Sequence, residues 1–183
     1  MVIWRDVTVL LRMAELLQCW REAEIAFDIA AALHRIKSEV DIYLVNEVAE
    51  VTRQIWLASK LLRDLYDLYP FYIERGHYLL DYLSVILPCL HRTLQDIRYH
   101  IGNYPEHSFG RIWIDLDADL QRQSDVSLRG RFTLYNDFLV QLIQLLSRSE
   151  ATFPLIGPFL TVSADHQCTM LQGRICCGRG FYG

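Results

Sequence analysis

The segment ILPCLHRTLQDIRYH, residues 86–100, concentrates the residue types most able to do chemistry in this chain. Cys89 and His91 are two residues apart, so on a helix they point to different sides and cannot form a nucleophile–base pair. His91, Asp96 and His100 are spaced by five and four residues, and only the last two can touch on a helix surface. The segment predicts no catalytic residue; an intrahelical pocket around Pro88, His91, Asp96 and His100 is the enzymatic alternative.

The acidic run DLDAD, residues 115–119, invites comparison with metal sites. A calcium loop beginning at Asp115 requires glycine at its sixth position and glutamate at its twelfth, where this chain has Leu120 and Val126. On a helix, alternate residues spread around the axis, so the three carboxylates cannot converge on one ion. We interpret the run as a solvated acidic face near a helix N-terminus, where the helix dipole favours carboxylates.

Metal-compatible side chains also occur near the C-terminus, at His166, Cys168, Cys176 and Cys177. Two of these cysteines are adjacent and no CxxC pair is present, which argues against a structural zinc site. No GxSxG, HExxH or Walker-type sequence occurs. The sequence therefore predicts no metal, no cofactor and no enzymatic activity.

The elements that would position these residues follow from apolar spacing. A heptad-type seam steps through Leu44, Val48, Val51, Ile55, Ala58, Leu62, Leu65 and Tyr69. It predicts a helix over 38–67 closed by Pro70, after a helix over 6–35, with the break placed near 31–38. In that first helix a broad apolar face is expected, made of Leu10, Leu11, Ala14, Leu17, Trp20 and Phe27, while Ala23, Ala26 and Ala30–Ala32 let a neighbouring helix approach closely.

The second half of the chain continues the same pattern. An apolar stripe from Leu83 to Ile101 passes through Pro88 without changing phase, so we expect a kinked but continuous helix, with a new helix starting at Pro88 as the alternative. Further helices are predicted over 109–123 and 128–147, the last with Ser127 as N-cap. The fold class predicted is a single all-α bundle of about five helices, residues 1–149.

Residues 150–183 differ from the rest of the chain. They contain five of the nine glycines, two of the five prolines and three of the five cysteines, and their helical periodicity is lost. We expect an irregular or disordered tail. A retained intron or a shifted reading frame would explain the abrupt change.

Composition limits the partners and the location of the protein. The formal charge of −4 argues against a general nucleic-acid binder. The longest uncharged stretches fall short of the roughly 20 residues that cross a bilayer, so no membrane partner is expected. The N-terminal apolar run is interrupted by charges, which argues against a secretory signal, and five cysteines without regular spacing do not predict a disulfide framework. The expected location is intracellular, either cytoplasmic or nuclear.

Three stretches carry a family resemblance: EVDIYLVNEV (39–48), ILPCLHRTLQDI (86–97) and RFTLYNDFLVQLIQLLSRS (131–149). They resemble a family of uncharacterised helical proteins of filamentous fungi with the patterns LLPCLxRTLxDI and RFxLYNxFLxxLxxLLxRS. The chain also resembles, more loosely, the helical N-terminal segments of fungal immune-receptor-like (STAND/NLR) proteins. The resemblance implies self-association or signalling and supplies no catalytic residues; RIWIDLDADL and the tail depart from the family pattern.

Aromatic residues gather at one helix corner, YDLYPFY, residues 66–72. Tyr66, Tyr69, Phe71 and Tyr72 cannot all be buried at a single turn, so they form a candidate interaction surface. The function predicted is a protein–protein interaction or scaffold and signalling module, which binds a protein partner or a second copy through an exposed helix face. Besides the enzymatic alternative, a mispredicted gene product without a selected function is a third reading.

Overall fold

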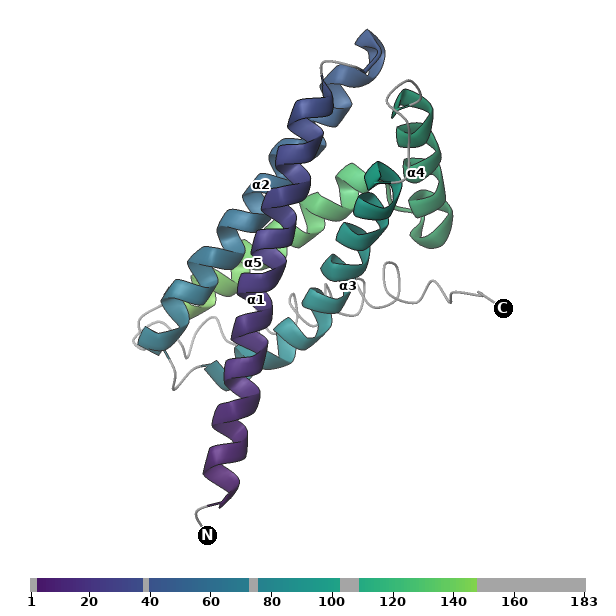
Figure 1. The fold of residues 1–183 in the computed structure, drawn as a ribbon. Helices are drawn as coiled ribbons and strands as arrows, with labels where there is room; N and C mark the ends of the chain where they lie inside the picture. The colour runs from purple at the N-terminus through teal and green to yellow at the C-terminus, as the bar shows by residue number, and fades with distance from the viewer. Residues whose placement is uncertain (1–2, 38–39, 73–75, 103–108, 148–183) are drawn as a thin grey trace, which may run out of the picture.

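The computed structural model describes residues 3–37, 40–72, 76–102 and 109–147, and within these ranges the regular structure is entirely helical (Figure 1). The predicted all-α fold class with five helices is confirmed. The expected tail at 150–183 lies outside the described residues. The elements are α1 (Ile3–Ile36), α2 (Ile42–Leu68), the short 3-10 helix η2 (Tyr69–Tyr72), α3 (Gly76–Gly102), α4 (Phe109–Ser124) and α5 (Leu128–Ser147).

Helices α1 and α2 form an antiparallel hairpin (Figure 1). Two aromatic contacts fix its register: the rings of Trp20 and Tyr66 lie 5.4 Å apart, and those of His34 and Trp56 also lie 5.4 Å apart. As residue numbers rise along α1, those of their partners fall along α2. The break between the two helices falls within 37–41, close to the predicted position.

The other two long helices complete a four-helix bundle. Helix α3 packs beside α1 and runs parallel to it, and α5 packs beside α2, where Asn136 donates a hydrogen bond of 3.0 Å to the carbonyl of Gln54 (Figure 1). Helices α3 and α5 meet through a 2.9 Å hydrogen bond between Thr93 and Tyr135. The order around the bundle is therefore α1, α2, α5, α3. Helices α1 and α3 run in one direction, and α2 and α5 run in the opposite direction (Figure 1). Helix α4 lies at one end of the bundle, where it contacts both α3 and α5 (Figure 1).

Small residues decide which side of α1 enters the core. Among the described side chains of α1, the fully buried ones are Cys19, Ala23, Ala26, Ala30 and Leu33, which step 4-3-4-3 along one face. They let the two backbones approach so closely that the Ser59 hydroxyl donates a 2.8 Å hydrogen bond to the carbonyl of Ala23. The predicted apolar face of α1 was therefore wrong for Leu17, Trp20 and Phe27, which are 58%, 42% and 45% exposed. The side chains of Leu10 and Leu11 lie outside the described residues.

The other helices agree more closely with the sequence. The seam of α2 is buried from Val48 to Tyr69, although Leu44 is only half-buried. Helix α3 continues through Pro88, as expected, with the proline ring on the exposed side, and it bends along its length (Figure 1). In the described parts of the chain, no helix combines the length and apolar character needed to cross a bilayer.

Candidate functional sites

The histidine of the 86–100 segment lies within hydrogen-bond distance of a buried carboxylate. His91 Nδ1 lies 2.8 Å from Glu22 Oε1 and 3.0 Å from Oε2, so the pair joins α3 to α1. The Glu22 side chain is only 2% exposed, whereas that of His91 is 40% exposed. Sequence reasoning missed Glu22, although its position three residues after Cys19, on the small-residue face, indicates a buried acid. This contact links α1 to α3. It is made by Nδ1, and the second ring nitrogen, Nε2, does not contact Glu22.

The remaining residues of the enzymatic alternative do not gather around His91. His100 Nδ1 contacts the backbone carbonyl of Asp96 at 2.8 Å, not its carboxylate. Burial raises the pKa of the Asp96 carboxyl, against the opposing effect of the Arg92, Arg131 and His100 charges. Its Oδ2 atom is buried without a hydrogen-bond partner among the described residues. Because each group faces a different neighbour, the geometry does not form the polar pocket that this alternative needs.

A buried polar cluster joins α3 to α5. The hydroxyl of Tyr135 donates to the carbonyl of Cys89 at 3.1 Å and lies 2.9 Å from Thr93 Oγ1. Burial raises the pKa of Tyr135 to about 12, so this hydroxyl stays protonated as a donor. Cys89 is 3% exposed, as expected of a residue next to the apolar seam.

The DLDAD run belongs to a reciprocal cap between α4 and α5. Asp117 Oδ1 accepts a 2.7 Å hydrogen bond from the backbone N–H of Leu128, at the start of α5. In return, Arg131 Nη2 donates to the Leu120 carbonyl at 2.5 Å and to Ser124 Oγ at 2.7 Å, which caps the end of α4. The run lies in the middle of α4, not near a helix N-terminus as expected, and the interpretation as a solvated acidic face is incomplete because Asp117 has a specific structural partner. No cluster of three or more metal-ligating side chains occurs in the described part of the chain.

The predicted N-cap of α5 is confirmed. Ser127 Oγ accepts a 3.2 Å hydrogen bond from the N–H of Gly130, and the Ser127 carbonyl accepts a 2.9 Å bond from Arg131 N. Gly130 is also constrained, because a Cβ atom there would lie 2.9 Å from Val126 Cγ1. The α4–α5 corner is thus fixed by caps at both helix ends.

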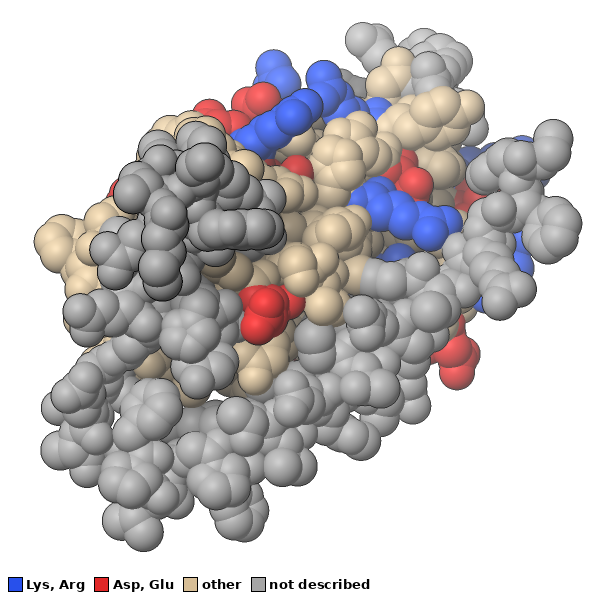
Figure 2. All heavy atoms as spheres, turned by 90° about the horizontal axis from the view of Figure 1, so that it is seen from below, with Lys and Arg blue, Asp and Glu red and all other residues tan. Residues whose placement is uncertain are grey.

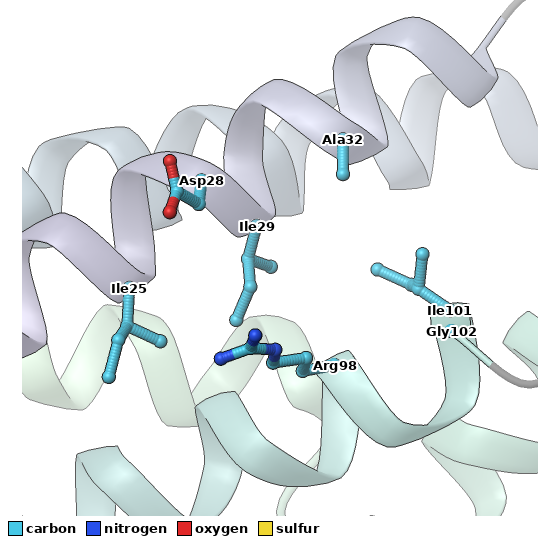
Figure 3. A pocket seen from close by; sticks show the side chains of 7 residues that line it. All are labelled: Ile25, Asp28, Ile29, Ala32, Arg98, Ile101 and Gly102. Atoms are coloured by element: carbon cyan, nitrogen blue, oxygen red, sulfur yellow. The ribbon is translucent and has the colours of Figure 1, made fainter.

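The structure contains a pocket between α1 and α3, with a volume of about 190 Å³ (Figure 3). Its walls are formed by isoleucines of both helices, and its edge includes two charged residues, Asp28 on α1 and Arg98 on α3. Figure 3 shows Arg98 reaching from α3 toward α1, with its guanidinium group close below Ile29. Sequence reasoning did not find this pocket, because it depends on α3 lying beside α1.

An aromatic patch lies where α1 and α2 meet on the outside of the bundle. We define it as Leu17, Trp20, Phe27, Arg63 and Tyr66. The guanidinium carbon of Arg63 lies 5.7 Å from the Trp20 ring centre and 5.2 Å from that of Phe27, both within cation–π range. Arg63 Nη2 also bonds Glu24 Oε1 at 2.9 Å, so its position is fixed from three directions.

The four residues of the predicted interaction surface have different environments. Tyr66 is half-buried, and its ring contacts that of Trp20 in a tilted arrangement, so it belongs to the aromatic patch. Tyr69 is only 2% exposed and packs in the core, and Tyr72 is half-buried against it. Phe71 is 81% exposed. The structure thus separates one core residue from three that contribute surface.

Charges are mixed on the face seen in Figure 2, where lysine and arginine side chains lie among aspartates and glutamates. This view shows no continuous basic tract of the kind that tracks a nucleic-acid backbone. The strongest local features therefore remain the aromatic patch and the α1–α3 pocket.

No protein-family model matches the chain, no curated protein matches it, and no solved structure matches its fold. The resemblance to fungal helical proteins therefore stays a prediction that rests on the three sequence stretches alone.

Proposed function

We propose that the protein is an interaction module that self-associates through the aromatic patch. The observation that supports this proposal is the stack of Arg63 on Trp20 and Phe27, which are 42% and 45% exposed. Tryptophan, tyrosine and arginine are the residues most enriched at the energetic centres of protein interfaces. Trp20, Tyr66 and Arg63 bring these three residue types together, and contacts within the chain hold them in place.

Charge complementarity favours a second copy as the occupant. Glu24 and Arg63 lie at the same height on the hairpin, since they form an ion pair of 2.9 Å. A two-fold axis parallel to the helices would place α1 of one copy opposite α2 of the other at equal heights. Arg63 of each copy would then face Glu24 of the other, and Trp20 would face Tyr66.

The alternative two-fold arrangement is unfavourable. An axis perpendicular to the helices would place α2 opposite α2, and would bring Arg63 and Lys60 of one copy near the same cations of the other. Like charges facing each other across an interface oppose association. The arrangement with α1 opposite α2 is self-complementary, as a symmetric dimer requires.

The proposal is consistent with the predicted intracellular location and with the self-association role that the fungal resemblance implies. The enzymatic alternative gains no comparable support, because its four residues face different neighbours. The Tyr66 prediction is retained in this surface, whereas Tyr69 contributes to the core instead.

Light scattering of the full chain after gel filtration, combined with a charge swap, tests the proposal. The wild type should run as a dimer and Arg63→Glu as a monomer, because the reversed charge faces Glu24 of the second copy. The double variant Arg63→Glu/Glu24→Arg should restore the dimer. Arg111→Glu, an exposed position on α4, is the matched control and should stay dimeric.

Circular dichroism of each variant separates lost association from lost folding. A wild type that remains monomeric up to about 100 μM, a concentration at which even weak specific dimers are populated, would contradict self-association. Binding of a different purified helical protein that is lost in Arg63→Glu would reassign the occupant and reject the second copy.

A further inference from the structure

The α1–α3 pocket lies on a different face from the aromatic patch and has a chemistry of its own. Ile25 and Ile29 from α1 and Ile101 from α3 provide apolar walls (Figure 3). Ala32 and Gly102 keep the end of the pocket open, and a Cβ atom at Gly102 would meet nothing within 4 Å. The pocket can therefore accept a branched aliphatic group.

Arg98 gives the pocket its polarity. Its guanidinium group reaches across the opening toward α1, beside the isoleucine side chains (Figure 3). Arg98 and Asp28 are both exposed, and within the described residues neither has a hydrogen-bond or ion-pair partner. An unpaired guanidinium next to an apolar surface favours a carboxylate, because its planar fork can donate two parallel hydrogen bonds to the two oxygens.

The volume limits the size of the ligand. At about 30 Å³ per liquid water molecule, 190 Å³ corresponds to roughly six waters. This is below the roughly 300–1,000 Å³ of pockets that hold drug-sized ligands. Because the pocket is open to solvent, this volume sets the part of a ligand that the pocket covers, which is a short aliphatic body beside one charged group.

We propose that this pocket binds a small aliphatic carboxylate, with the carboxylate on Arg98 and the branched body against Ile25, Ile29 and Ile101. Two sources share this chemistry: a free branched-chain acid and an apolar α-amino acid. The second would also present an ammonium group, for which Asp28 at the pocket edge is the available anion. The site is independent of the proposed self-association.

Titrations of the ¹⁵N-labelled full chain, followed by NMR, test the inference. The probes are 4-methylpentanoate, its neutral amide and leucine. We expect 4-methylpentanoate to shift the amide signals of the pocket with a dissociation constant of about 1 mM, as suits so few buried atoms. The neutral amide and the variant Arg98→Gln should each bind about tenfold more weakly, since the charged pair is lost.

Two further variants separate a specific site from general surface binding. Ala32→Leu should abolish binding by filling the pocket from α1, while Arg111→Gln on α4 should bind as the wild type does. If leucine binds more tightly than 4-methylpentanoate, and Asp28→Asn removes that advantage, the source is an amino acid. If leucine binds as tightly as 4-methylpentanoate, or more weakly, the natural ligand is a free branched-chain acid.

The inference is overturned if 4-methylpentanoate produces no pocket shifts at about 10 mM, well above the expected dissociation constant. It is also overturned if Arg98→Gln or Ala32→Leu binds as tightly as the wild type. Loss of dimerisation in Arg63→Glu without any change in this titration would leave the pocket intact, so the two proposals fail separately.

Discussion

Replacing His91 by alanine should destabilise the bundle by separating α3 from α1. The Glu22 carboxylate is 2% exposed and lies 2.8 Å from His91 Nδ1. Removing the hydrogen-bond partner of a buried polar group typically costs about 1–3 kcal/mol, and more for a carboxylate, because the desolvation of that group is no longer compensated. His91 is 40% exposed, so water can enter the vacated volume and lower this cost. We therefore expect a loss of about 2–3 kcal/mol in the free energy of unfolding.

Urea unfolding followed by circular dichroism at 222 nm measures this loss, with the slope of the transition checked for two-state behaviour. Glu22→Gln should cost about 1 kcal/mol or less, because the amide oxygen still accepts a hydrogen bond from His91. The double variant Glu22→Leu/His91→Ala should recover part of the stability lost in His91→Ala, since no buried charge remains.

The single variant Glu22→Leu completes a double-mutant cycle with His91→Ala and Glu22→Leu/His91→Ala, and this cycle gives the coupling between the two side chains. Glu47→Ala, which removes an exposed side chain from the same hairpin, is the control and should change stability by less than about 1 kcal/mol. A loss below about 0.5 kcal/mol in His91→Ala would refute the reasoning, because the carboxylate would then not depend on its partner.

Four further outcomes are expected. Arg131→Met should lower the free energy of unfolding in urea by about 1–3 kcal/mol, since the Leu120 carbonyl and Ser124 Oγ both lose the guanidinium donor. Asp125→Gly should raise it by about 0.5–1 kcal/mol, because Asp125 has a φ of 57° at the end of α4. Pro88→Ala should fold and melt no lower than the wild type, since it restores a helix hydrogen bond; failure to fold would show that the bend is required. Burial raises the pKa of Asp96 above its value in the unfolded chain. Asp96 therefore lowers the free energy of unfolding as pH rises from the unfolded pKa through the folded pKa. Asp96→Asn should flatten this part of the stability–pH curve and be more stable at neutral pH.

The buried seam of α2 could be predicted because its large apolar residues repeat every three and four positions from Val48 to Tyr69. The buried face of α1 could not be predicted from the spacing of its large apolar residues, because this helix carries two apolar stripes. Alanines form the inner stripe and larger residues such as Trp20 and Phe27 form the outer one. Hydrophobicity alone favours the large residues for the core, whereas close packing against α2 selects the small ones.

The sites depend on neighbours that are distant in the sequence. Glu22 and His91 are separated by 69 positions, and nothing in their local spacing brings them together. The cap from Asp117 to Leu128 spans the α4–α5 corner, so the acidic run looked like an isolated face. The pocket at Arg98 likewise requires the parallel placement of α3 beside α1, which periodicity does not encode.

The most direct test of the central claim, that the outer α1–α2 face is a docking surface, is ¹⁹F NMR of the protein labelled with 5-fluorotryptophan. The Trp20 signal, identified by its loss in Trp20→Phe, should move as concentration rises from about 10 μM to 1 mM, because the second copy covers it. The signal of Trp113, which is 2% exposed in the core, should stay fixed. A Trp20 signal that does not move over this range, in a protein whose light-scattering mass is that of one chain throughout, would contradict self-association through this face.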